Sequence, residues 1–207
     1  MRAPATLPGQ YLPTGVRGAA GRTSGPGGQL ETVGQVAERA VELGIVAPGA
    51  LTALDADDLR EPLSYYDDDP AAALVDLLAE LGVAVRVDAK SGGDLLDGYR
   101  SLFDSFAACT GGAVTITDIE LYEGNAGERI RMLVDGDVLD WHVEHGDSRR
   151  YLDTLMVFEI ADSLTPRADT DPRVFTCVLD ADGDSGHVFA DPTAFAVLAA
   201  ELGVTLD

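Results

Sequence analysis

Residues 128–144, ERIRMLVDGDVLDWHVE, decide the fold, because two runs of alternating apolar and polar side chains flank the dipeptide Asp135-Gly136. Alternation with a period of two is typical of a strand that is buried on one face. The Asp-Gly dipeptide favours a two-residue hairpin turn. We therefore predict an antiparallel hairpin whose strands are residues 128–134 and 138–144.

The side chains on each face of this hairpin fix how its strands pair. Counting outward from Val134 opposite Asp137 gives the cross-strand pairs Met132–Leu139 and Ile130–Trp141 on one face, and Arg131–Asp140 and Arg129–His142 on the other. Apolar partners then meet apolar partners, and a cation meets an anion. A shift of one residue would destroy both matches.

Helix boundaries are marked by the same signals at several places. Asp69-Pro70 and Asp191-Pro192 each place a side-chain acceptor at the N-cap and proline at the first helical position. Glycine in the sequences ELGI, ELGV and ELGV, at Gly44, Gly82 and Gly203, is typical of a left-handed helix end. The predicted helices include 70–81 and 192–202.

The remaining elements follow from apolar periodicity. Asp94 caps a helix with a stripe of apolar residues, and a longer helix is predicted at 148–164 with the stripe Leu152, Leu155, Met156, Ile160 and Leu164. Apolar residues change parity at Thr117-Asp118, which indicates a bulge. A second hairpin is predicted at 173–179 and 186–190. The order is helices, strand, helix, three strands, helix, two strands and helix, which predicts an α+β fold with a mainly antiparallel sheet and helices mostly on one face.

Three regions differ in composition. Residues 1–30, the N-terminal arm, are rich in Gly and Pro, and such a segment alone cannot offset its ordering entropy. Residues 31–82 are helical, and residues 83–207 hold the α+β body. We expect 31–207 to form one compact domain.

The chain carries 36 acidic and 14 basic residues, a formal charge of −22. Arg2, Arg17 and Arg22 precede the first acidic residue, so residues 31–207 hold all 36 acids and 11 bases, a charge of −25. This charge disfavours nucleic-acid and anionic membrane partners and favours a basic protein. Lys90 is the only lysine, and adaptation to high salt or GC-rich coding would explain this Asp-rich, Lys-poor composition as well as a basic partner would.

Several classes of function lack their sequence signals. Neither a phosphate-binding glycine loop nor a GxSxG nucleophile elbow occurs. No apolar run is long enough for a membrane span and no signal-peptide pattern is present, so we expect a cytoplasmic protein. We assign no catalytic residue and no cofactor.

Two groups of residues are candidates for binding a basic partner. Tyr65, Tyr66, Asp67 and Asp68 combine stiff aromatic area with negative charge. The second group is Asp140, His142 and Glu144 on the polar face of the hairpin. The alternative for the first group is that one tyrosine packs on the core while the aspartates favour a helix N-terminus.

Metal and nucleophile sites have weaker candidates. Asp180, Asp182 and Asp184 partly match a calcium loop, but Ser185 stands where the sharp turn needs glycine and a strand precedes the loop. His142 and Glu144 would need a third ligand, for which His187 is conceivable. If Leu179 pairs with Gly186, Cys177 and His187 point to opposite faces and form no dyad, although a shift of one residue would bring them together.

From Leu95 onward, the segments WHVEH (141–145), YLDTLMVFEIADSL (151–164) and DPTAFAVLAAELG (191–203) resemble the layout of bacterial immunity proteins paired with polymorphic toxins. The resemblance covers about half the chain and implies a non-enzymatic acidic protein that occludes a basic toxin. Two alternatives stay open. One is a structural or assembly subunit that uses its N-terminal arm, and the other is a metal-assisted enzyme or small-ligand protein with a carboxylate-lined pocket.

Overall fold

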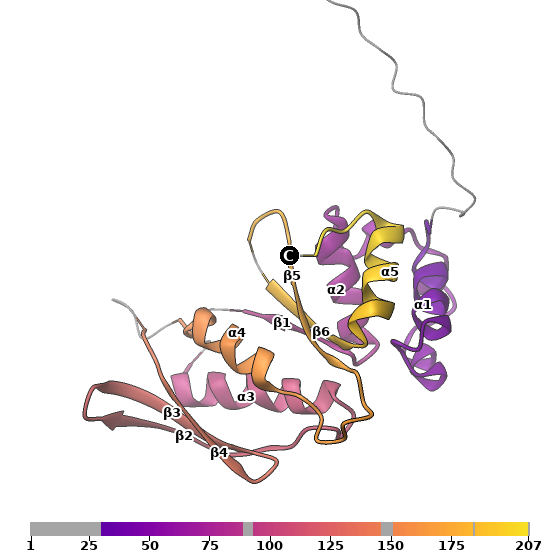
Figure 1. Ribbon diagram of the computed structural model, residues 1–207. Coiled ribbons are helices and arrows are strands. Elements are labelled where there is room, and N and C mark those ends of the chain that lie inside the picture. Colours follow the sequence, from indigo (N-terminus) through magenta and orange to yellow (C-terminus); the bar gives the residue numbers. More distant parts are fainter. Residues whose placement is uncertain (1–29, 89–92, 146–150, 184, 207) are drawn as a thin grey trace, which may run out of the picture.

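The computed structural model describes residues 30–88, 93–145, 151–183 and 185–206. Its elements follow the predicted order (Figure 1). The helices and strands are α1 (Val33–Glu42), η1 (Pro48–Ala53), η2 (Asp58–Arg60), η3 (Leu63–Tyr65), α2 (Pro70–Glu80), β1 (Ala84–Val87), α3 (Leu95–Cys109), β2 (Ile116–Gly124), β3 (Gly127–Val134), β4 (Asp137–His142), α4 (Thr154–Ser163), β5 (Val174–Leu179), β6 (Ser185–Ala190) and α5 (Pro192–Leu202). Residues 1–29 of the N-terminal arm lie outside the described residues.

The strands form two antiparallel sheets of three strands each, in the orders β1–β6–β5 and β2–β3–β4. The predicted α+β class with antiparallel pairing is therefore confirmed, with two sheets in place of one. Helices cover one face of β2–β3–β4, as expected, and both faces of β1–β6–β5 (Figure 1). The second arrangement is possible because β5 and β6 are apolar on both faces.

Two apolar cores lie on opposite sides of the β1–β6–β5 sheet. The first core joins α1, α2 and α5 to side chains such as Val178 and Val188. The second core joins α3, α4 and the inner face of β2–β3–β4 to Val85, Phe175 and Phe189. Neighbouring residues of one strand thus enter different cores, as the alternation of side chains along a strand requires.

The β3–β4 hairpin has the predicted pairing. Met132 lies opposite Leu139, Ile130 opposite Trp141, and Arg131 opposite Asp140. Asp135 and Gly136 adopt positive φ angles of 52° and 84°, as a two-residue turn of this type requires. The predicted bulge is also present, since the β2–β3 pairing shifts between Thr117 and Glu120.

The predicted helix caps are confirmed. Asp69, Asp94 and Asp191 accept hydrogen bonds from the first backbone N–H groups of α2, α3 and α5. Gly82 and Gly203 have φ angles of 78° and 73°, a conformation that side chains with a Cβ rarely adopt. These local signals set where the helices begin and end.

The predicted start of the fourth long helix is wrong. Helix α4 begins at Thr154, and Asp153 caps it by accepting a 3.1 Å hydrogen bond from the Met156 N–H. The predicted first turn, from Ser148, falls partly on residues outside the described ranges. Leu155, expected in the core, is 74% exposed, and Val157 and Ala161 are buried instead. The other four residues of the predicted stripe, Leu152, Met156, Ile160 and Leu164, are buried as expected.

The predicted pairing of the second hairpin is also wrong, by one residue. Leu179 lies opposite Ser185, which places Val178 opposite Gly186 and Cys177 opposite His187. In this register Val178 is buried in the first core, which also contains α2, and Leu179 is exposed at the end of the strand. Gly186 contributes to this choice, because its Cα faces Val75 of α2 and leaves no room for a side chain.

Candidate functional site

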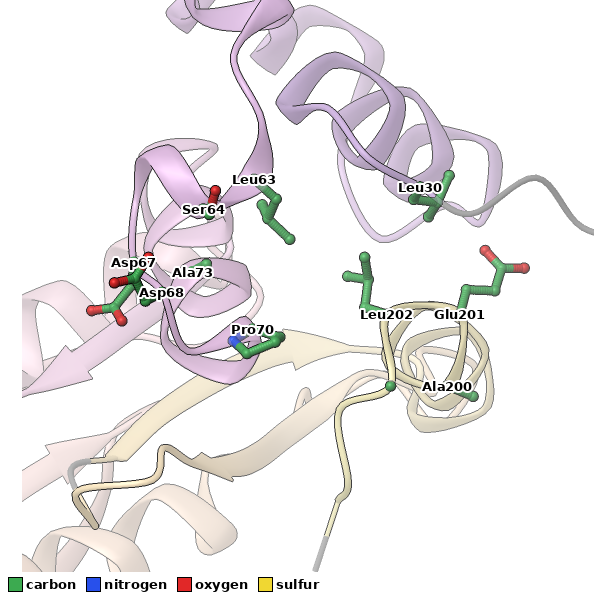
Figure 2. Close-up of a pocket in the computed structure, with 11 residues that line it drawn as sticks. Leu30, Leu63, Ser64, Asp67, Asp68, Pro70, Ala73, Ala200, Glu201 and Leu202 are labelled. Atoms are coloured by element: carbon green, nitrogen blue, oxygen red, sulfur yellow. The ribbon is translucent and has the colours of Figure 1, made fainter. Parts of the chain in front are cut away.

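A groove of about 470 Å³ lies between the start of α2 and the end of α5 (Figure 2). One wall holds Leu63, Pro70 and Ala73, and the opposite wall holds the last turn of α5, including Leu202. Leu30 also lines the groove, and Asp67, Asp68 and Glu201 add carboxylates to the apolar lining (Figure 2). The volume is within the range of ligand pockets in proteins, which is about 300–1,000 Å³.

The turn before α2 positions the two aspartates of this groove. Asp69 uses one carboxylate oxygen to cap α2 through the Ala71 N–H and the other to accept a 2.6 Å hydrogen bond from the Ala181 N–H. These backbone hydrogen bonds lower the pKa of Asp69. Asp67 accepts a 2.9 Å bond from the Asp69 N–H. Asp69 is thus structural, whereas Asp67 and Asp68 are exposed beside the groove.

The two adjacent tyrosines have different roles. Tyr66 donates a hydrogen bond to Glu80, and its partial burial raises its pKa. Tyr65 packs edge to face against Tyr66, with ring centroids 5.7 Å apart, yet it is 61% exposed. Tyr65 is thus packed on one side against Tyr66 and otherwise open to solvent. Of the predicted pair, Tyr65 is therefore the side chain available for contact.

The segment from Asp55 to Asp69 is strongly acidic, with seven carboxylates and one base, Arg60. Asp55 accepts hydrogen bonds from the N–H groups of Asp57 and Asp58, which lower its pKa. Arg60 pairs with Asp57 at 2.8 Å. Glu201, across the groove, is held by two hydrogen bonds from Arg39. The negative charge next to the groove therefore comes mainly from Asp67 and Asp68.

The second predicted binding group lies elsewhere. Asp140, His142 and Glu144 belong to the β3–β4 hairpin and its continuation, at the opposite end of the molecule from α5 (Figure 1). Asp140 accepts hydrogen bonds from the Tyr122 hydroxyl, Arg129 Nε and Arg131 Nη2, at 2.6, 2.6 and 3.2 Å. These hydrogen bonds lower the pKa of Asp140 to about 2. The Asp140 carboxylate is therefore already bound by side chains of its own sheet.

The other two members of that group are solvent-facing. His142 Nε2 lies 3.1 Å from the Ala126 carbonyl, and its Nδ1 is 3.8 Å from a Glu144 oxygen. Both side chains are exposed. They lie in a different sheet from His187, so the structure does not bring this conceivable third ligand to them.

The calcium-loop candidates do not converge in the described structure. Asp180 pairs with Arg86 Nη2 at 3.0 Å, and its other oxygen accepts a hydrogen bond from the Asp182 N–H. Asp184 lies outside the described residues. Within the described ranges, no group of three or more His, Cys, Asp or Glu side chains is placed to hold a metal ion.

Cys177 and His187 are direct cross-strand partners, which corrects the predicted placement on opposite faces. The His187 ring is 0% exposed and lies between Phe106 and Phe158, with centroid distances of 5.4 and 5.2 Å. Neither ring nitrogen has a hydrogen-bond partner among the described residues. Burial lowers the pKa of His187 to about 4. Because the imidazole makes no hydrogen bond to the thiol, this pair lacks the contact that activates a nucleophile.

A buried polar chain links three elements in a way that local sequence patterns do not show. Tyr99 Oη lies 2.9 Å from His145 Nε2 and accepts a 2.9 Å hydrogen bond from the Asp153 N–H. His145 Nδ1 lies 2.7 Å from a Glu128 oxygen. The chain thus connects α3 to β3 and to the N-cap of α4. Periodicity identifies Tyr99 only as a core residue, and nothing in the local sequence pairs it with His145.

Replacing Tyr99 by phenylalanine is expected to lower the free energy of unfolding by about 1–2 kcal/mol, because the Asp153 N–H and His145 Nε2 lose their buried partner. Urea denaturation followed by circular dichroism measures this loss. Tyr122→Phe is the control, since it removes a hydroxyl that bonds to a more exposed carboxylate. Equal stability of Y99F and the unmodified protein would contradict a structural role for the chain.

No helix among the described residues has the length and apolar character needed to span a membrane. Comparison of the chain with protein-family models, with curated proteins and with solved structures finds no match.

Proposed function

We propose that this protein is a non-enzymatic binding protein that covers a basic segment of a protein partner with the groove between α2 and α5. The observation that carries the proposal is a groove whose lining combines apolar side chains with the exposed carboxylates of Asp67 and Asp68, while Tyr65, in the same segment, exposes its ring. Aromatic rings supply contact area at low entropic cost, and carboxylates around them select a basic partner.

The partner class follows from charge. Residues 31–207 carry a formal charge of −25, which attracts basic surfaces over several ångströms and accelerates association at low salt. A toxin with a cationic substrate cleft is such a partner, and the resemblance to immunity proteins supports it. Inhibition then occurs by occlusion, since the acidic face covers the cleft.

The test is capture of partners from native lysate at low and moderate salt, using the full chain and two variants of equal charge. D67N/D68N removes the two groove carboxylates, and D104N/D169N removes two exposed carboxylates elsewhere. We expect a basic protein to be retained by the unmodified chain and by D104N/D169N at low salt, and to be lost from D67N/D68N.

Association kinetics with the captured partner then distinguish a local effect of Asp67 and Asp68 from the effect of the overall negative charge of the protein. We expect the association rate of D67N/D68N to fall on the order of tenfold at low salt, and that of D104N/D169N to change much less. If no basic protein is retained at low salt, or if both variants lose it equally, the proposed site is wrong.

A further inference from the structure

The groove between α2 and α5 is also the place where the N-terminal arm joins the folded body. Leu30, the first described residue, lines the groove on the side of the end of α5 (Figure 2). The 29 residues before it therefore connect to the body at the groove itself. A segment of the arm needs only a short connection to return to the groove.

The arm and the groove are complementary in charge and in apolar content. The charged side chains of residues 1–29 are Arg2, Arg17 and Arg22, without a single carboxylate. Leu7, Tyr11, Leu12 and Val16 lie together in the sequence, directly before Arg17. The groove offers apolar walls for such side chains and places Asp67 and Asp68 beside them.

The length of the intervening chain permits this contact. Leu30 lies 14 residue steps after Val16 in the sequence, a distance that spans up to about 46 Å when extended at roughly 3.3 Å per residue. A covalent connection of this length holds the segment at an effective concentration on the order of millimolar. Weak contacts thus suffice for occupation within one molecule, whereas a second copy would have to reach that concentration in solution.

We propose that residues 7–17 of the N-terminal arm occupy the groove of the same molecule. Tyr11 and Leu12 lie against the apolar walls formed by Leu63, Pro70 and Leu202, and Arg17 lies near Asp67 and Asp68. The arm then acts as an internal competitor that a basic partner must displace. This regulatory consequence rests on the proposed function, but the docking itself requires no partner.

Site-specific photo-crosslinking in the full chain tests the docking. p-Benzoylphenylalanine replaces Tyr11, the purified protein is irradiated at low salt, and crosslinked peptides are mapped by mass spectrometry. We expect crosslinks within monomers, at residues 63–73 and 200–203. D67N/D68N is expected to reduce their yield about threefold, and D104N/D169N to leave it unchanged. Circular dichroism verifies that each variant is folded.

Two results would overturn the inference. Crosslinks to the same groove in a covalent dimer would identify the arm of a second copy as the occupant. Crosslinks spread over the surface without preference for the groove, at the same yield in D67N/D68N, would show that the arm has no defined site. Both results are obtained without any partner, so they are independent of the proposed function.

The competition is tested with a captured basic partner and the variant Y11S/L12S, which leaves the charges of the arm in place. If the arm occupies the groove in two thirds of the molecules, removing its apolar anchors raises the apparent affinity about threefold. Unchanged affinity together with groove crosslinks in the monomer would refute competition. A partner that binds well while Tyr11 makes no groove crosslinks would leave the proposed function intact and refute the docking.

Discussion

Replacing His187 by leucine is expected to stabilise the protein by about 1–3 kcal/mol near pH 7, because both ring nitrogens are buried and have no hydrogen-bond partner in the part of the chain that the structure describes. A buried polar group in this state loses its contacts with water and gains none in the folded protein. Leucine fits the apolar surroundings of Phe106 and Phe158 without this cost. Chemical denaturation at pH 7 measures the gain.

The same substitution is expected to change how stability depends on pH. Burial lowers the pKa of His187 from 6.5 to about 4, an effect that the Asp162 carboxylate opposes only in part. Between these values the unfolded chain binds a proton that the folded protein does not, so stability falls as the pH is lowered from 6.5 to 4. The full loss is about 3 kcal/mol. In H187L this loss is absent, and the remaining acid sensitivity comes from groups that titrate lower, such as Asp140.

His142→Gln is the matched control for this prediction, because it removes an exposed histidine from the other sheet. H142Q retains the buried His187, so we expect it still to lose stability as the pH falls from 6.5 to 4. If H187L loses stability over this range as steeply as the unmodified protein, His187 is not the group that the folded state keeps neutral.

The two hairpins explain why one strand register could be predicted from the sequence and the other could not. In β3–β4, apolar and charged residues alternate, so a shift of one residue would place Arg131 opposite an apolar side chain. In β5–β6, both faces are buried between two cores, and Val178, Val188 and Phe189 fit either face. Without alternation, the register depends on contacts with α2 that are remote in the sequence.

The candidate site likewise has a part that local sequence predicts and a part that depends on contacts remote in the sequence. Tyr65, Asp67 and Asp68 form a local motif, so the adjacency of aromatic and acidic residues is enough to predict them as candidates. The groove beside them also needs Leu30 and Leu202, from opposite ends of the chain. The sequence could not show that Tyr122 and Arg129 donate hydrogen bonds to the Asp140 carboxylate, because these contacts form only in the folded sheet.

Replacing Gly186 by alanine is expected to destabilise the protein by about 3 kcal/mol, at the upper end of the usual cost of overpacking. A Cβ at this position would lie 2.8 Å from Val75 Cγ2 and closer still to Cγ1. Val75 is buried in the first core, so it cannot move aside at low cost. Gly49→Ala is the control, since a Cβ added there would meet no atom within 4 Å, and its stability should change by less than about 0.5 kcal/mol.

A second substitution separates this steric effect from other causes. Val75→Ala removes both methyl carbons and leaves Cβ 3.1 Å from the new one, so G186A/V75A should be more stable than the sum of the two single losses predicts, by about 1–3 kcal/mol. Strict additivity would contradict the close approach of β6 to α2. Because Asp69 bonds to both Ala71 and Ala181, moving α2 away from the sheet also strains the turn that carries Asp67 and Asp68. We therefore expect G186A to shift the amide resonances of residues 67–71, and V75A to reverse this shift in the double variant.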